Sequence, residues 1–299
     1  MPTFSILTAA FNAGPFISGA LASAACQQEQ DWELVVVEDG SHDETETLVE
    51  AFRNQQSGRR VIYENPGNNQ GVSATRNRLL KLASGRYLAF LDADDLWEPD
   101  HLLDLRKQLD AGHTLAVSGL RLWYPDTPEP DEIHLISENL LENPRLSLFQ
   151  QSIIQTSSSI AFSAETAKRT GWFDTSLRIG EDRDYWFRAL EADGTIGSTG
   201  KPSCHYRKHS QSSMSNILKI AEDSVFFYRK HFQAPGVPQR LARRKLSDSL
   251  FSWGRLIRRQ DAKLARKVFF ESWTLRPLDV RLLAFGALAA ISRTKRATH

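Results

Sequence analysis

Cysteine is scarce in this chain of 299 residues, with Cys26 and Cys204 as the only two. They do not form a C-x-x-C pair, which argues against a zinc ribbon or a thioredoxin-type redox site. Two cysteines cannot build a disulfide framework, as expected of a protein in a reducing compartment. We therefore expect both to be small, buried side chains.

A long hydrophobic run is also missing. Residues 1–8 lack the basic start and the extended apolar stretch of a signal peptide. The nearest candidate for a membrane span, residues 282–291, is shorter than the ~18–20 apolar residues that cross a bilayer. From these two absences we expect a cytoplasmic protein.

What is present is ordinary for a folded protein. Apolar residues make up 41% of the chain and charged residues 24%. The length is enough for one large domain with a smaller appendage. A sizeable core is therefore expected, and disorder is not.

Two hydrophobic periods alternate through the first hundred residues. The predicted strands cover residues 4–8, 32–37, 61–64 and 86–91. The predicted helices cover residues 14–26, 42–52 and 72–83. This rhythm predicts an α/β fold with a mostly parallel central sheet and helices on both faces. Ligands of such sheets bind beyond the carboxyl ends of the strands, so function is expected there.

Two local signals set helix ends in this region. Ser41 and Glu44 have the spacing of a capping box, which predicts that a helix begins near His42. Gly85 follows the third predicted helix and is expected to form its C-terminal cap.

Later segments differ in character. Residues 125–143 are rich in proline and acids and are predicted to be a loop, and a helix is predicted from Glu181 to about Ala192. From Arg240 onward there are 15 Lys and Arg against 4 Asp and Glu. Apolar residues recur there at helical spacing, which predicts two or three amphipathic helices. Their basic faces are either solvated or lie against anionic lipid or a membrane-held partner.

Three carboxylates follow the fourth predicted strand, at Asp92, Asp94 and Asp95. Such closely spaced acids repel one another unless a cation is present. Mg²⁺ and Mn²⁺ prefer hard oxygen ligands and take only a few from the protein, with phosphates and water supplying the rest. The cluster therefore indicates a metal–diphosphate site, with an acidic helix-capping turn as the alternative.

Two charged residues lie near other strand ends. Asp39 follows the second predicted strand, and because Ser41 can cap the next helix, Asp39 is left without an evident structural task. It could accept hydrogen bonds from a base or a ribose. Arg76 falls on the apolar stripe of its helix, where an unpaired charge is costly, so it is expected to face a carboxylate or a phosphate.

Two further motifs carry ionisable groups. Asp182 lies at the start of a predicted helix, whose dipole favours the ionised carboxylate that a general base needs; an acidic helix cap is the alternative. Arg207 and His209 belong to a basic run followed by hydroxyl residues. This composition suits a diphosphate, and His209 could also bind a metal.

Taken together, these motifs resemble family 2 glycosyltransferases, which are inverting enzymes with the glycosyltransferase A-type fold. The resemblance runs over roughly residues 3–215. It rests on SILTAAFN at 5–12, VEDGS at 37–41, residues 69–77, LDADD at 91–95, GED at 180–182 and R-x-H at 207–209. Phe11 stands where the family often has tyrosine, and Glu38 where many members have aspartate.

The resemblance implies a role for each matching residue. Thr8, Phe11 and Asp39 would bind the nucleoside, and Arg76 would lie near the nucleotide. Asp92 would contact the ribose or the sugar.

The remaining roles concern the metal and the reaction. Asp94 would bind Mn²⁺ or Mg²⁺ directly, with His209 as a second ligand. Arg207 and His209 would close over the diphosphate, and Asp182 would be the catalytic base.

The resemblance also implies domains and partners. Residues 1–215 would form the catalytic domain, with a nucleotide-binding half at 1–100 and an acceptor half at 101–215. Residues 216–299 lie beyond the resemblance, and their composition and spacing predict a basic helical appendage that could contact the inner face of the cell membrane. The expected partners are a nucleotide-sugar donor, with UDP favoured over dTDP and GDP, and a glycan or lipid-linked acceptor used in surface polysaccharide or glycolipid synthesis. No nucleic acid partner is expected.

Three other functions fit the sequence less well. A sugar nucleotidyltransferase would need a basic, glycine-rich loop after the first strand, but residues 9–14 contain no Lys or Arg. A non-catalytic nucleotide-sugar or glycan-binding module would be expected to lack the aspartate cluster or the base. A dehydrogenase would need G-x-G-x-x-G after the first strand, and this motif is missing.

Overall fold

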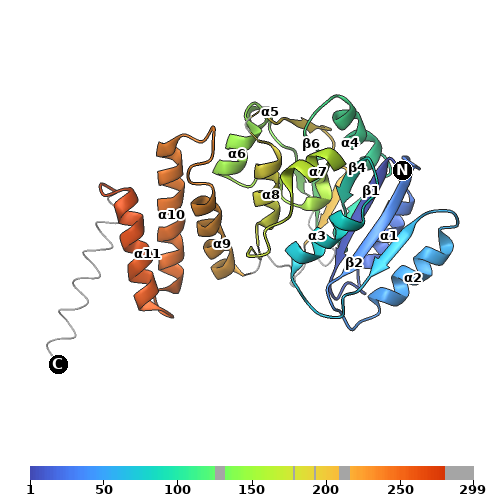
Figure 1. The fold of residues 1–299 in the computed structure, drawn as a ribbon, viewed down its shortest axis with the longest axis horizontal. Coiled ribbons are helices and arrows are strands. Elements are labelled where there is room, and N and C mark those ends of the chain that lie inside the picture. Colours follow the sequence, from blue (N-terminus) through green and yellow to red (C-terminus); the bar gives the residue numbers. More distant parts are fainter. Residues whose placement is uncertain (125–131, 178, 192, 209–215, 280–299) are drawn as a thin grey trace. The chain divides into compact units, whose positions relative to one another are not determined.

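The protein is described by a computed structural model of residues 1–124, 132–177, 179–191, 193–208 and 216–279. The chain forms two compact units, Met1–Ser212 and Ser213–His299 (Figure 1). The first unit contains every residue predicted to belong to the site. The second contains the basic region.

The first unit is built on a seven-stranded sheet in the order β10-β6-β9-β4-β1-β2-β3. The strands are β1 (Phe4–Ala10), β2 (Trp32–Glu38), β3 (Val61–Glu64), β4 (Tyr87–Phe90), β6 (Leu115–Val117), β9 (Ile160–Ser163) and β10 (Ile196–Ser198). Only β9 runs antiparallel to its neighbours. The predicted α/β class with a mostly parallel sheet is confirmed.

Helices cover both faces of this sheet, because alternate side chains of each strand point to opposite faces. One face buries Phe4, Leu34 and Ala89 with the apolar sides of α1 (Ile17–Ala25), α2 (Thr45–Gln55) and α4 (His101–Asp110). On the other face Phe90 packs against Phe162 and Trp186, the latter from α8 (Glu181–Ala189). The helix α3 (Val72–Leu82) contacts β1 and β2. The central strands read as continuous apolar runs because both faces are covered.

A smaller mixed sheet has the order β5-β11-β7-β8. Its strands are β5 (Leu96–Trp97), β11 (Cys204–Arg207), β7 (Leu120–Trp123) and β8 (Glu132–His134). The strand β5 comes directly after the aspartate cluster and pairs with β11, which ends at Arg207. This sheet therefore joins two segments that lie more than a hundred residues apart.

Short helices complete the first unit. They are α5 (Glu138–Leu141), α6 (Pro144–Gln150), the 3₁₀ turn η1 (Ser157–Ser159) and α7 (Ala164–Thr170). The prediction of a loop at 125–143 was thus partly wrong, because the described part of this segment contains β8 and α5. Residues 125–131 lie outside the described part.

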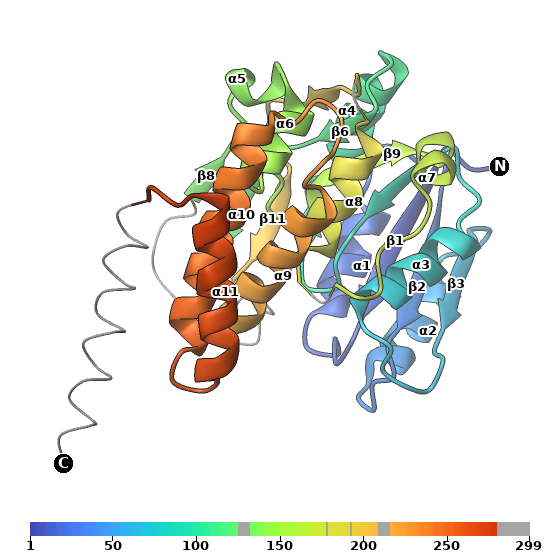
Figure 2. The same cartoon turned by 60° about the vertical axis from the view of Figure 1, so that its left-hand side comes forward.

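The second unit contains α9 (Ile217–Lys230), α10 (Gln239–Ile257) and α11 (Ala262–Leu275). The helix α10 packs against both α9 and α11 (Figure 2). Gly254 allows a close approach, since a Cβ there would lie 2.8 Å from the Phe269 ring. The amphipathic helices predicted from residue 240 are confirmed, and α9 lies within the region 216–299 that was expected to be helical.

Two predicted helix ends were wrong. The helix α2 begins at Thr45 and not near His42, because the Thr45 backbone N–H donates to Asp43 at 3.1 Å. The Ser41 hydroxyl does not cap this helix, since it accepts the backbone N–H of Asn12 at 2.8 Å. Gly85 does not cap α3, whose last turn leads into an extended residue. It allows a close approach instead, since a Cβ would lie 2.5 Å from the Ser5 backbone nitrogen.

The two cysteines differ in burial, and the described helices differ from membrane-spanning segments. Cys204 is buried as expected, but Cys26 is exposed, so that expectation was half wrong. None of the helices in the described part of the chain combines the length and hydropathy needed to cross a bilayer.

Candidate active site

The aspartate cluster forms a turn at the end of β4. The Asp95 backbone N–H closes the turn on the Asp92 carbonyl at 3.1 Å. The serine-rich segment formed by Thr156 and η1 supports this turn. The Ser158 hydroxyl accepts the Asp92 N–H at 2.9 Å, and the Thr156 hydroxyl donates to Asp95 at 3.0 Å. The turn is thus fixed before any ligand binds.

The electrostatics of this turn favour a cation. Burial, together with the neighbouring carboxylates of Asp94 and Asp92, raises the pKa of Asp95 well above its usual range. Partial burial also raises the pKa of Asp92, although the guanidinium of Arg76 opposes this shift. The Asp92 side chain is 27% exposed, so it remains within reach of a ligand.

Arg76 is buried and pairs with two carboxylates from distant segments. Its Nη1 lies 2.5 Å from Glu181 Oε1, and its Nη2 lies 3.2 Å from Asp92 Oδ1. Of the two partners expected for Arg76, the structure shows the carboxylate. The nearby acids raise its pKa despite the opposing effect of burial, so the guanidinium stays charged.

Glu181 was not singled out in the sequence, although it is the closest partner of Arg76. Gly180, with a φ of 78°, turns the chain so that α8 begins with Glu181 and Asp182. Burial raises the pKa of Glu181 to about 7, opposed by Arg76 and reinforced by Asp182 and Asp92. The adjacent acids of the GED motif were the available signal, but which one turns inward depends on tertiary structure.

Asp182 lies beside this pair. It is half-buried, and its Oδ1 accepts the backbone N–H of Arg183 at 2.6 Å. The Arg183 side chain donates to the carbonyls of Leu148 and Phe149 at 2.8 and 2.9 Å, which anchors this turn of α8. Asp182 acts electrostatically on Arg76, Asp92 and Glu181, so the structure brings the predicted base to the aspartate cluster.

The site therefore holds more acid than base. The acids are Asp92, Asp94, Asp95, Glu181 and Asp182, and the bases among the described residues are Arg76, Arg207 and Lys208. The described residues contain no group of three His, Cys, Asp or Glu side chains arranged to hold a metal. This donor set fits a divalent cation that takes one or two protein carboxylates and completes its shell with phosphate and water.

Asp39 does have a structural task, contrary to the sequence-based interpretation. Its two oxygens accept the backbone N–H groups of Gln70 and Gly71 at 2.7 and 2.8 Å, which fixes the start of α3. The bonds reach 31 and 32 residues along the chain, so local sequence could not reveal them. A carboxylate accepts about four hydrogen bonds, so Asp39 keeps capacity for a ligand.

The two other predicted nucleoside contacts lie on and beyond β1. Phe11 follows this strand and is 53% exposed, so its ring can stack on a base. Thr8 is fully buried and its hydroxyl has no hydrogen-bond partner, so its contact with a nucleotide stays a prediction.

Arg207 reaches the cluster from β11. Its backbone N–H donates to Asp95 Oδ1 at 3.0 Å, and its Nε donates to the Asp94 carbonyl at 2.9 Å. The guanidinium carbon lies 3.9 Å from the Trp123 ring centroid and 5.3 Å from that of Phe16. Arg207 is thus held against the turn that carries Asp94. His209 lies outside the described residues, so its predicted roles stay predictions.

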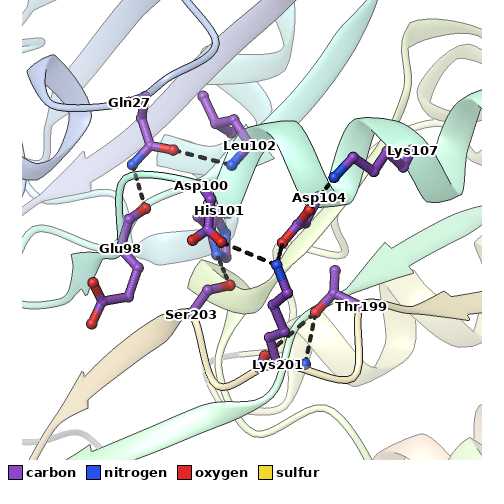
Figure 3. Close-up of polar contacts among 10 residues, drawn as sticks. All are labelled: Gln27, Glu98, Asp100, His101, Leu102, Asp104, Lys107, Thr199, Lys201 and Ser203. Carbon is purple, nitrogen blue, oxygen red and sulfur yellow. Dashed lines mark hydrogen bonds and ion pairs between the residues drawn. The ribbon is translucent and has the colours of Figure 1, made fainter.

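A polar frame holds the start of α4, where Gln27 bonds to the backbone of Glu98 and Leu102 and His101 bonds to Ser203 (Figure 3). His101 is buried, stacks on Trp97 with centroids 4.5 Å apart, and contacts the Ser203 hydroxyl at 2.8 Å. Burial lowers the pKa of His101 to about 3, so the ring is neutral. The Trp97 indole donates to the Ser158 carbonyl at 2.6 Å, which connects this frame to the segment beneath the aspartate turn.

A cavity of about 220 Å³ lies beside that serine-rich segment, with Ser159 among its lining residues. Polar side chains line it, including His134 of β8, Ser137, Ser152 and Gln155. The amide of Gln155 lies 3.3 Å from His134 Nδ1. Because Thr156 follows Gln155 and contacts Asp95, the cavity and the aspartate turn share one supporting segment.

Comparison with known proteins bears on this site. The family model described as "Glycosyl transferase family 2" matches residues 5–170. The chain is 34% identical over 227 residues to the Escherichia coli UDP-Glc:alpha-D-GlcNAc-diphosphoundecaprenol beta-1,3-glucosyltransferase WfaP, covering 73% of this chain and 82% of that protein. It is 30% identical over 266 residues to the succinoglycan biosynthesis protein ExoO of Rhizobium meliloti, covering 82% and 73%.

Solved structures share the fold. Staphylococcus aureus TarS 1-349 in complex with UDP-GlcNAc has a TM-score of 0.70 and 19% identity, covering 94% of this chain and 83% of that one. The mannosyltransferase PcManGT from Pyrobaculum calidifontis, in complex with GDP-Man and Mn²⁺, has a TM-score of 0.66 and 18% identity, covering 99% and 82%. At these identities the likeness establishes the fold alone, and it confirms the predicted A-type architecture.

The raised pKa of Glu181 predicts how folding stability depends on pH. Between the ordinary value of 4.5 and about 7, the folded chain holds a proton at Glu181 that the unfolded chain has lost. Stability therefore falls as pH rises through this window. Glu181→Gln removes this titration, so the fall in the urea midpoint between pH 5 and pH 7.5 should become smaller.

The control is Glu165→Gln, which changes an exposed glutamate in the first turn of α7. This variant should retain the wild-type pH dependence. An unchanged pH dependence in Glu181→Gln would contradict the assignment of a buried, proton-binding Glu181.

Proposed function

Because the chain belongs to glycosyl transferase family 2, and so transfers a sugar from a nucleotide-sugar donor, we propose that its donor is a UDP-sugar. The observation that carries this proposal is the acidic turn at the end of β4, held by Arg76 and Glu181 and faced by Arg207. The relative WfaP is named for UDP-glucose, and the TarS structure contains UDP-GlcNAc.

We place the nucleoside over the ends of β1 and β2. The exposed ring of Phe11 supplies a stacking surface, and the remaining lone pairs of Asp39 can accept a hydrogen bond from the base. Asp39 is already oriented by Gln70 and Gly71, so the bond costs little reorganisation. Thr8 would support this group from within the strand. Arg76 and Asp92 would define the side nearest the ribose and sugar.

Asp94 would hold Mn²⁺ or Mg²⁺ together with the donor diphosphate, and His209 would be a second ligand. The excess of carboxylates supports this, as do the raised pKa values of Asp92 and Asp95. The bound ion would stabilise the charge that develops on the departing diphosphate. Arg207 adds fixed positive charge on the same side, already positioned by the Asp94 carbonyl.

Asp182 would act as the catalytic base. Its carboxylate takes the proton of an acceptor hydroxyl as that oxygen bonds to the anomeric carbon of the sugar. The bond between the anomeric carbon and the diphosphate oxygen breaks on the opposite face, which inverts the configuration. One carboxylate suffices because no covalent glycosyl-enzyme intermediate forms.

For the acceptor, we propose a sugar linked through a diphosphate to a lipid, as named for WfaP. The cavity beside the serine-rich segment supplies hydroxyl and amide groups suited to a sugar, and it belongs to the predicted acceptor half at 101–215. Residues 1–215 would then form the catalytic domain, and residues 216–299 the appendage.

The first experiment is titration of UDP into the full chain by calorimetry, with and without Mn²⁺. UDP binding should tighten at least about tenfold with Mn²⁺, because Asp94 would hold an ion that offsets the negative charge of the diphosphate. Asp94→Ala should lose this enhancement. The control is Asp100→Ala, which changes an acid paired with Lys201 at 3.1 Å rather than one at the site.

Three outcomes would decide the donor. Tighter binding of dTDP or GDP than of UDP would replace the proposed nucleotide. Equal UDP affinity with and without Mn²⁺ would contradict the proposal that a metal binds at this site. Binding of UDP without turnover of any UDP-sugar would favour a binding module.

The second experiment tests the base. Asp182→Asn should bind UDP and Mn²⁺ as the wild type does, because the site keeps Arg76, Glu181 and Asp92. Its kcat for transfer should fall by about 10²–10⁴, the usual contribution of a general base. Wild-type kcat in this variant would exclude Asp182 as the base, whereas loss of UDP binding would give it a structural role.

The third experiment tests the acceptor cavity. With UDP-glucose and a short-chain lipid diphosphate carrying GlcNAc, Gln155→Ala should raise the acceptor KM by about 2–10-fold, as expected for one lost hydrogen bond. The Kd for UDP should not change. The control Gln55→Ala lies at the end of α2, away from the cavity. An unchanged acceptor KM would contradict the proposal that this cavity binds the acceptor.

A further inference from the structure

The helix α11 has two contrasting faces. Its inner face packs against α10, where Ser272 and Ser247 exchange hydrogen bonds and Val268 is buried. Its outer face carries three exposed cations, Lys263, Arg266 and Lys267. The aromatic rings described next lie on that same outer face.

Phe270 and Trp273 continue the outer face at helical spacing. The five positions 263, 266, 267, 270 and 273 follow the three- and four-residue steps that place side chains along one stripe. Phe270 is 65% exposed and Trp273 is 41% exposed, and their ring centroids lie 5.9 Å apart. The two rings therefore form one continuous apolar patch next to the cations.

Acidic side chains do not neutralise this stripe. Glu271 points elsewhere and pairs with Arg229 of α9, and Asp261 accepts the Leu264 N–H at the start of α11. Within the described part of the chain, none of the three stripe cations forms an ion pair with an acid. Their charge is available to a partner.

The end of α10 extends the same chemistry. Arg255 and Arg259 are exposed there, and Leu256 is 40% exposed. Arg255 and Leu256 lie in the last turn of α10 and Arg259 follows before α11, so the end of α10 adds two cations and one apolar side chain. We refer to these eight residues together as the basic aromatic face: Arg255, Leu256, Arg259, Lys263, Arg266, Lys267, Phe270 and Trp273.

We propose that the basic aromatic face binds the surface of an anionic phospholipid bilayer. Lysine and arginine would contact headgroup phosphates, and the Phe270 and Trp273 rings would enter the boundary between headgroups and acyl chains. Trp and Phe next to Lys and Arg on an amphipathic helix are typical of such interfacial contact. A nucleic acid or an acidic protein could match the cations, but an exposed apolar patch beside them favours lipid.

This contact would be peripheral, since no helix among the described residues could span a bilayer. The inference does not rest on the proposed donor or acceptor. Each surface cation contributes roughly a fivefold gain in partition to an anionic membrane, so several cations and two rings together give measurable binding.

The test is flotation of the full-length protein with vesicles of phosphatidylcholine alone or with about one-third phosphatidylglycerol. The wild type should float with the anionic vesicles and not with the neutral ones, and added salt should weaken the binding. Lys263→Glu/Arg266→Glu/Lys267→Glu should lower the partition more than about tenfold. Phe270→Ser/Trp273→Ser should lower it at unchanged net charge.

A matched control changes three exposed cations outside the face, as Lys81→Glu/Lys168→Glu/Arg240→Glu. This variant has the same net charge as the α11 triple variant and should float better. UDP binding by every variant checks folding independently of lipid, so failure of the donor proposal and failure of this one remain distinguishable.

Several results would overturn the proposal. They are a wild type that ignores anionic vesicles, an α11 triple variant that floats as well as the control, and a Phe270→Ser/Trp273→Ser variant with undiminished flotation. In the last case, equal binding of wild type and variant to heparin would identify the face as a general polyanion site.

Discussion

The first unit depends on one buried guanidinium. Arg76 comes from α3, and it joins the end of β4 through Asp92 to the start of α8 through Glu181, which is 105 residues away. Removing one member of a buried ion pair typically costs about 3–5 kcal/mol, because the other charge is left uncompensated. The same contacts that hold α3 and the end of β4 to α8 therefore also place Asp182 beside the aspartate turn.

The site retains electrostatic repulsion that a core would normally avoid. Burial and neighbouring carboxylates raise the pKa of Asp95, Asp92 and Glu181, so the folded chain holds protons there that water would remove. A divalent cation bound there would relieve that repulsion and would compete with those protons. The frame around Trp97 and Ser158 keeps the turn in place against this repulsion.

The sequence predicted the sheet well, because buried strands such as β2 read as continuous apolar runs and ligand sites follow strand ends. It placed Asp92 and Asp94 at a strand end for the same reason, whereas Asp182 and Arg207 were joined to them by the resemblance to family 2 glycosyltransferases. The failures involve partners distant in the chain. Asp39 binds Gln70 and Gly71, and Ser41 binds Asn12, so local capping patterns misassigned both. Glu181 could not be separated from Asp182 without knowing which of them turns toward Arg76.

The near-zero net charge of the chain is the sum of an acidic region and a basic region. Residues 240–299 carry 15 basic and 4 acidic residues, whereas the whole chain has a net charge of only +1, so the preceding residues are strongly acidic overall. An acidic first unit would suit the proposed site for a cation and an anionic diphosphate, and an anionic membrane would repel such a unit. A basic second unit offsets that repulsion where attraction is needed. Separating the two charges along the chain allows each surface to keep its own electrostatic partner, which an evenly mixed surface of the same net charge could not do.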